Sequence, residues 1–238
     1  MNTTPALPRI GGLTPFTTTD YPGHISAVIF LQGCPWRCHY CHNPPLQIKT
    51  TTQPVDWPTL TVWLQKRQGL LDAVVFSGGE PCADPGLYDA MQVVKSLGFK
   101  IGLHTAGAYP RRLKTILPLL DWVGLDIKAP FKDYDTIIGV PYRGQPVRIS
   151  AEAILNAGLP YEFRTTLHAT LLNETQLWLL ANQLALWGVQ QYAWQLFRPI
   201  GCNTMTLIKA SQIGYPNPRL VEQVSQLFPY FTLRRTFL

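Results

Sequence analysis

The chain has 238 residues, of which 46% are hydrophobic and 14% charged; these values suit one compact domain and exclude a disordered chain or a coiled coil. The net charge is +6, but the basic residues are scattered, and without a basic stripe we expect no nucleic-acid partner. The apolar runs are strand-sized, and residues 1–8 lack a basic segment followed by an apolar stretch, so we expect no membrane association and a cytoplasmic location.

Short apolar segments, rich in Val, Ile, Phe and Tyr, alternate with amphipathic ones along the chain. The apolar segments predict strands at 27–31, 73–77, 100–104, 122–127, 161–166 and 192–197. The amphipathic segments predict helices at 58–67, 85–97, 111–120, 150–157 and 174–187. Asp84 and Pro85 predict the N-cap and first residue of the second helix. Glycines are expected to end three of the helices, at Gly98, Gly158 and Gly188.

This alternation predicts an α/β fold of parallel strands joined by crossover helices. Six units are too few for the closed barrel of eight, so we expect an open, partial (β/α)6 TIM-like barrel. A single domain would span residues 1–238, with its barrel at about 16–199 and the C-terminal 200–238 packing on the barrel. Such folds gather their active sites at the carboxyl ends of the strands, where this chain carries polar or ligating groups.

A cluster of three cysteines follows the first predicted strand. Cys34, Cys38 and Cys41 lie in the run CPWRCHYC, and three thiolates so spaced can surround one small metal body. Ordinary iron–sulfur sites use four cysteines, so one iron would lack a protein ligand. The alternative is a structural zinc site completed by His39 or His42, although such sites usually draw ligands from two separated knuckles.

The cysteine run, with Tyr40 before its third cysteine, resembles the signature of the radical S-adenosylmethionine (SAM) superfamily. The stretches DYPG at 20–23, QGC at 32–34 and CHNP at 41–44 resemble the glycyl-radical-enzyme activases. Among them, the activating proteins of anaerobic ribonucleoside-triphosphate reductase are the most similar, with pyruvate formate-lyase activase a nearby relative. The resemblance covers about 16–199. It implies a 4Fe-4S cluster on Cys34, Cys38 and Cys41, with SAM on the open iron.

The resemblance also implies a SAM pocket at the ends of the later strands. Gly78, Gly79 and Glu80 would hold the amino group of SAM, since exposed backbone and a carboxylate can accept hydrogen bonds from an ammonium. Asp126 and Lys128 lie two apart on one side of a strand; alone they would indicate only an ion pair. The resemblance implies that they contact SAM, and it assigns further SAM contacts to Tyr40, Thr105, Arg164 and Arg198.

One position departs from the family pattern. Activases commonly have Asp-Thr-Asn-Gly after the third strand, where this chain has His104-Thr-Ala-Gly107. A neutral histidine cannot supply the negative charge that a monovalent cation needs. Either that cation is absent here or Asp126 alone anchors it. The isolated Cys82 is expected to pack as a small apolar residue, and neither Cys202 nor the turn-rich segment 203–218 has a predicted role.

The resemblance implies activation of a glycyl-radical enzyme, with anaerobic ribonucleotide reductase as the expected partner and reduced flavodoxin or ferredoxin as the electron donor. A second hypothesis keeps the same chemistry but directs it at a small molecule or modified nucleoside. A third, from another class, is a zinc-binding interaction module without catalysis, which would not explain the polar residues on the later strand ends.

Overall fold

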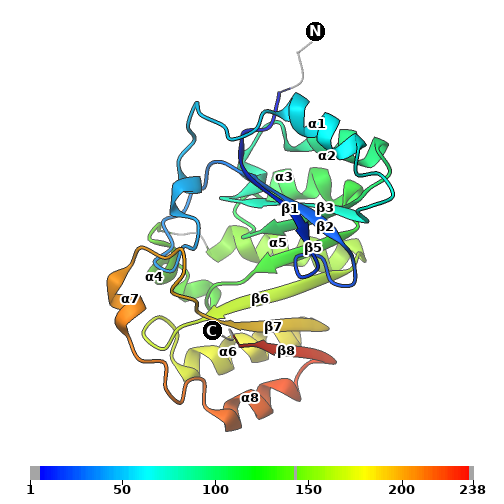
Figure 1. The fold of residues 1–238 in the computed structure, drawn as a ribbon. Coiled ribbons are helices and arrows are strands. Elements are labelled where there is room, and N and C mark those ends of the chain that lie inside the picture. The colour runs from blue at the N-terminus through cyan, green and yellow to red at the C-terminus, as the bar shows by residue number, and fades with distance from the viewer. Residues whose placement is uncertain (1–5, 142–143, 236–238) are drawn as a thin grey trace.

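The strands of the chain form one curved sheet. The computed structural model describes residues 6–141 and 144–235, and its strands follow one another across the sheet in chain order (Figure 1). They are β1 Ile10–Thr17, β2 Ser26–Leu31, β3 Ala73–Gly78, β4 Lys100–Thr105, β5 Trp122–Asp126, β6 Tyr161–Leu167, β7 Gln191–Leu196 and β8 Tyr230–Arg234. The strands β2 to β8 are parallel, whereas β1 runs antiparallel to β2.

The sheet does not close, because in the described residues β1 pairs only with β2 and β8 only with β7. The predicted α/β fold, an open partial barrel, is therefore confirmed. Two edge strands were not predicted: β8 adds one parallel strand to the expected six, and β1 adds an antiparallel one. β8 comes from the C-terminal segment and extends the edge of the sheet.

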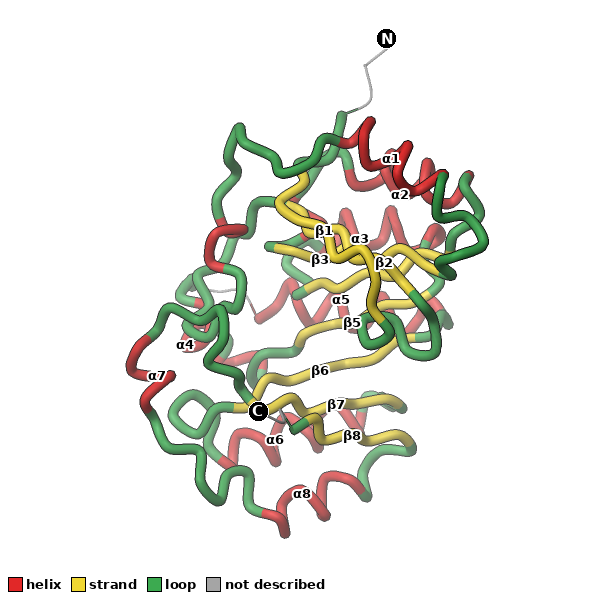
Figure 2. Tube along the Cα trace, in the orientation of Figure 1, coloured by secondary structure: helices red, strands yellow, loops and turns green. Residues whose placement is uncertain are grey.

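Helices follow most of the parallel strands, and the longer ones lie on one side of the curved sheet (Figure 2). They are α1 Trp57–Gln65, α2 Leu87–Ser96, α3 Pro110–Ile116, α4 Asp135–Ile138, α5 Gly144–Ala157, α6 Glu174–Leu186, α7 Met205–Lys209 and α8 Pro218–Ser225. No helix among the described residues is long and apolar enough to cross a membrane.

The start of α2 differs from the prediction. Asp84 was expected to be its N-cap and Pro85 its first residue, but the helix begins at Leu87 with Gly86 as N-cap. The Asp84 carboxylate instead accepts hydrogen bonds from the backbone N–H of Gly86 at 2.8 Å and of Arg9 at 3.0 Å. Asp84 therefore closes a turn before the helix and attaches the N-terminal segment to it.

Two apolar clusters lie on opposite faces of the sheet. The larger one joins the outer face to the helices, whereas the smaller one lies inside the barrel and comprises Tyr21, Val28, Ala73, Val75 and Trp122. Successive side chains of a strand point to opposite faces, so β2, β3 and β5 contribute to both clusters.

The loop between β1 and β2 enters the barrel at the amino-terminal ends of the parallel strands. The ring of Tyr21 stacks on Trp122 at a centroid distance of 5.5 Å. A Cβ atom on Gly102 would lie 3.1 Å from the Tyr21 ring. A side chain at Gly102 would crowd this ring, and the loop forms a floor beneath the carboxyl ends of the strands.

Candidate active site

A cavity of about 850 Å³ lies at the carboxyl ends of the parallel strands. Every residue predicted for the site lines it except Glu80: Cys34, Cys38, Tyr40, Cys41, Gly78, Gly79, Thr105, Asp126, Lys128, Arg164 and Arg198. Residues that are up to 164 positions apart in the chain thus share one cavity, as the partial-barrel prediction requires.

The cysteine loop follows β2, and hydrogen bonds to the backbone of α4 hold it in place. The backbone N–H groups of Arg37 and His39 donate to the carbonyl oxygens of Ile138 and Ile137, at 2.9 and 3.1 Å. The three cysteines of the loop are free thiols, each partly exposed. Burial raises the pKa of Cys34 to about 12. Metal binding at this loop would therefore have to displace protons from the thiols.

Glycines at the end of β3 let that strand lie directly against the cysteine loop. A Cβ atom on Gly79 would lie 2.6 Å from the carbonyl oxygens of Gly33 and Leu46. Gly78 has φ +120°, and its Cβ would lie 2.3 Å from the carbonyl oxygen of Leu31. Side chains here would push β3 and the loop apart, so the cavity wall depends on both glycines.

Glu80 lies behind this wall and not in it. Its side chain is buried, and its carboxylate accepts hydrogen bonds from the Thr105 hydroxyl at 2.7 Å, the Ala106 N–H at 2.8 Å and the Cys82 N–H at 3.0 Å. Burial raises the pKa of this carboxyl despite these hydrogen bonds. In this structure Glu80 fixes the segment after β4, which itself lines the cavity.

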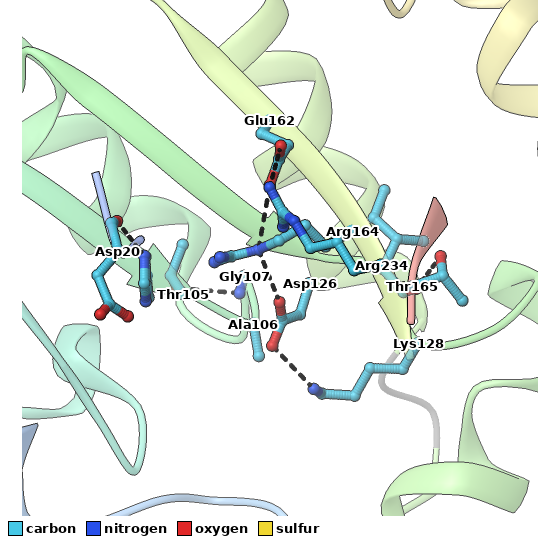
Figure 3. Close-up of polar contacts among 12 residues, drawn as sticks. Asp20, Thr105, Ala106, Gly107, Asp126, Lys128, Glu162, Arg164, Thr165 and Arg234 are labelled. Atoms are coloured by element: carbon cyan, nitrogen blue, oxygen red, sulfur yellow. Dashed lines mark hydrogen bonds and ion pairs between the residues drawn. The ribbon is translucent and has the colours of Figure 1, made fainter. Parts of the chain in front are cut away.

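Charged side chains of opposite sign meet on the other side of the cavity (Figure 3). The Asp126 carboxylate lies 3.4 Å from the Lys128 Nζ and 3.4 Å from the Arg164 Nε. Burial raises the pKa of Asp126, but the two cations outweigh it and the net pKa is lowered. Burial lowers the pKa of Lys128, but the effects of Tyr40 and Asp126 outweigh it, and the net pKa is well above its usual value. Both groups stay charged at neutral pH.

His104 and Asp20 meet at the cavity floor. The His104 Nε2 donates to the carbonyl oxygen of Asp20 at 2.8 Å. Burial, and then the positive charge of Arg164, lower the pKa of His104 to about 3. The imidazole is thus neutral at physiological pH and contributes no charge to the cavity.

Comparison with known proteins identifies the family. The model of the radical SAM superfamily matches residues 28–178, a span that contains the cysteine loop and the strand ends from β2 to β6. The chain belongs to the radical SAM superfamily. Its cofactors are accordingly a 4Fe-4S cluster and SAM.

Two relatives of this radical SAM protein carry the names of activating enzymes. A putative glycyl-radical enzyme activating enzyme of Methanocaldococcus jannaschii is 27% identical over 194 residues, which are 77% of this chain and 79% of the relative. A pyruvate formate-lyase-activating enzyme of Clostridium pasteurianum is 34% identical over 142 residues, 57% of this chain and 59% of the relative. The resemblance to activases is thereby confirmed at modest identity.

Solved structures confirm the radical SAM fold. SuiB of Streptococcus suis, bound to its precursor peptide SuiA, superposes with a TM-score of 0.69 at 15% identity over 87% of this chain; the chain spans about half of SuiB, 48%. QueE of Escherichia coli superposes with a TM-score of 0.55 at 16% identity, over 97% of this chain and 95% of QueE.

The residues of the cysteine loop fit a cluster better than a single ion. A zinc ion holds each thiolate sulfur at about 2.3 Å, which requires its ligands to converge on one point. The three thiols of the loop line one cavity of about 850 Å³, which is large compared with a single ion. Sulfurs spread around a cavity suit a body with several metal atoms.

The remaining predicted residues differ in how closely they are held. The Tyr40 ring lies 5.4 Å from the Lys128 Nζ, within reach of a cation–π contact. Arg198 is exposed at the rim, where its carbonyl oxygen lies 2.9 Å from the Nε2 of His42. Cys82 is buried among apolar residues, and Cys202 lies behind the cysteine loop, with its sulfur 3.7 Å from the carbonyl oxygen of His39.

Sequence reasoning missed two charged residues beside the cavity. Glu162 on β6 is buried, and Arg234 on β8 binds its carboxylate through two nitrogens, each at 2.8 Å. Glu162 could have been found, because it is two residues from Arg164 and shares its face of the strand. Arg234 could not, because its strand was not predicted and the pair is 72 residues apart.

Proposed function

We propose that this chain is a glycyl-radical-enzyme activase and that its partner is anaerobic ribonucleoside-triphosphate reductase. The similarity to a putative activating enzyme over 77% of this chain and 79% of that relative carries the proposal. When bound, the cluster and SAM supply a one-electron cleavage of SAM into methionine and a 5′-deoxyadenosyl radical, which takes a hydrogen atom from a glycine of the partner. The overall charge of +6 suits an acidic electron donor such as reduced flavodoxin or ferredoxin.

In this proposal Cys34, Cys38 and Cys41 hold the cluster and leave one iron open. The three cysteines lie on a loop that the α4 backbone fixes, which favours a preformed site. The loop has no fourth cysteine that could bind the remaining iron.

The SAM contacts are divided between two walls of the cavity. The backbone at Gly78 and Gly79 accepts hydrogen bonds from the amino group of SAM, and Glu80 supports that wall through Thr105 and the Ala106 N–H. On the other wall, Lys128 and Arg164 offer cations to the SAM carboxylate. Tyr40, Asp126 and Arg198 complete the pocket, and Asp126 pairs with both cations. A monovalent cation at Asp126 stays a prediction.

The decisive experiment is electron paramagnetic resonance of a mixture of the reconstituted enzyme, SAM, a reductant and anaerobic ribonucleotide reductase. We expect a glycyl-radical signal with the wild type and with Cys82→Ala, whose sulfur lies outside the cavity wall, and none with Cys38→Ala. SAM cleavage without a radical on the reductase would contradict the activase proposal and leave the superfamily membership intact.

A second candidate is a radical SAM enzyme that acts on a small molecule or modified nucleoside. A 7-carboxy-7-deazaguanine synthase of Methanopyrus kandleri is 26% identical over 130 residues, 46% of this chain and 52% of the relative. This candidate predicts that a deazapurine precursor, and not the reductase, accelerates the formation of 5′-deoxyadenosine. Comparing the two additions under identical reducing conditions distinguishes the candidates.

A further inference from the structure

Five charged side chains of alternating sign cross the interior of the barrel (Figure 3). In spatial order they are Arg234, Glu162, Arg164, Asp126 and Lys128. The first contact is a two-pronged one at 2.8 Å, whereas the remaining ones are 4.0, 3.4 and 3.4 Å long. The row begins on the edge strand β8 and ends at the proposed SAM pocket.

Arg234 occupies both oxygens of a carboxylate that has almost no access to water. The Glu162 side chain is 3% exposed, and a buried carboxylate without a cation is strongly unfavourable. Both nitrogens of the Arg234 fork donate to it, one to each oxygen. Paired in this way, Glu162 needs no further cation.

The Nε–H donor of Arg164 consequently stays without a hydrogen bond among the described residues. Its Nε lies 4.0 Å from Glu162 and 3.4 Å from Asp126, yet it makes no hydrogen bond within the described chain although it is buried. Arg164 also lines the cavity. A buried donor without a hydrogen bond beside a cavity is a suitable partner for an incoming carboxylate.

Arg234 reaches Glu162 across the intervening strand β7. Arg234 lies on β8 and Glu162 on β6, so its side chain crosses the inner face of β7. Ala193 of β7 is aligned with Arg164 of β6 and with Thr232 of β8, and aligned residues of parallel strands point to the same face. The small side chain of Ala193 leaves the passage open.

We propose that Arg234 is a positioning residue for SAM binding: it neutralises Glu162 and thereby keeps the Arg164 Nε available to the SAM carboxylate. Without Arg234, the cation that the structure places beside Glu162 is Arg164. The buried carboxylate would then draw Arg164 away from Asp126 and from the ligand. This inference rests on the proposed SAM-binding role of Arg164.

The test is the SAM dissociation constant of the reconstituted protein, measured by anaerobic equilibrium dialysis, for Arg234→Gln, Arg234→Lys and the double variant Glu162→Gln/Arg234→Gln. We expect Arg234→Gln to weaken SAM binding about tenfold or more. The double variant regains most of the loss, because it removes the competing carboxylate. Arg234→Lys, which keeps the charge but not the fork, gives an intermediate value and carries the test if Arg234→Gln does not fold.

Arg219→Gln is the matched control, because it removes the same charge from the exposed first turn of α8, and we expect wild-type affinity. A purely structural role of Arg234 in attaching β8 would leave the double variant as weak as the single one. That result, or unchanged affinity in Arg234→Gln, overturns the inference while the proposed function stands. Absence of SAM binding in the wild-type holoprotein overturns both.

Discussion

The imidazole of His104 is held neutral at the cavity floor, and this has a consequence for stability. Its pKa is lowered to about 3 by burial and by Arg164, whereas an unfolded histidine titrates near pH 6.5. Below about pH 6.5 the unfolded chain therefore binds a proton that the folded chain does not. Stability is fully present above that pH and falls as the pH drops toward about 3.

His104→Gln tests this linkage. The amide can still donate to the Asp20 carbonyl oxygen, but it has no proton to gain. We expect the wild type to lose up to roughly 2 kcal/mol more of its unfolding free energy than the variant between pH 7 and pH 5. Urea unfolding at the two pH values measures the difference. Equal losses in both proteins would contradict the neutral, buried state of the imidazole.

At the level of residues, the sequence was informative where chemistry and spacing coincide. Cys34, Cys38 and Cys41 carry a recognisable spacing, and Asp126 and Lys128 share a strand face, so their presence at one cavity could be predicted. The direction of the Glu80 side chain could not be read from its motif, because it depends on donors at and after the end of β4. Partners distant in the chain, such as Glu162 and Arg234, are set by packing that no local pattern encodes.

At the level of elements, the end of β3 is the most sensitive segment of the cavity wall. We expect Gly78→Ala to lower the unfolding free energy by more than about 2 kcal/mol, since it adds a backbone clash to an unfavourable φ. Gly98→Ala is the matched control: its φ is +86° but nothing lies within 4 Å of the added carbon, so about 1 kcal/mol is expected. Urea unfolding and SAM binding report the difference; equal costs would refute the close approach of β3 to β2.

Edge strand β8 makes a second prediction at this scale. The Phe231 ring lies 5.4 Å from Trp194 and 6.3 Å from Tyr192 of β7, whereas Tyr230 is 69% exposed. Phe231→Ala should therefore cost about 2 kcal/mol of unfolding free energy, and Tyr230→Ala no more than about 0.5 kcal/mol. Thermal denaturation compares them, and the reverse order would mean that β8 does not pack on β7 as described.

The two strands that were not predicted, β1 and β8, show why some strands cannot be recognised from the sequence. β1 contains two glycines and a proline in eight residues, IGGLTPFT, a composition that is unfavourable for strands. β8 has a readable pattern of aromatic and β-branched residues, YFTLR, but only its pairing with β7 distinguishes it from a loose tail. The strands β2, β3 and β5 were predictable because they are buried on both faces and read as apolar runs.

At the level of the whole molecule, an open cavity in a partial barrel should couple ligand binding to global stability. A ligand that binds only the folded chain stabilises it by about 2.7 kcal/mol at a concentration of 100 times its dissociation constant. We expect SAM to raise the melting temperature of the reconstituted wild type and to have a much smaller effect on Cys38→Ala. An equal shift in both proteins would show that SAM binds independently of the cysteine loop.

The floor built by Tyr21 and Trp122 has a consequence for the sequence of events in turnover. Because the loop between β1 and β2 fills the barrel from below, SAM and, in the proposed function, the protein partner would both approach the cavity from the strand ends. In the proposed activase, SAM would therefore enter before the partner docks, and methionine and 5′-deoxyadenosine would leave after the partner has withdrawn. Turnover would accordingly follow a fixed order of arrivals, with the partner last to come and first to leave.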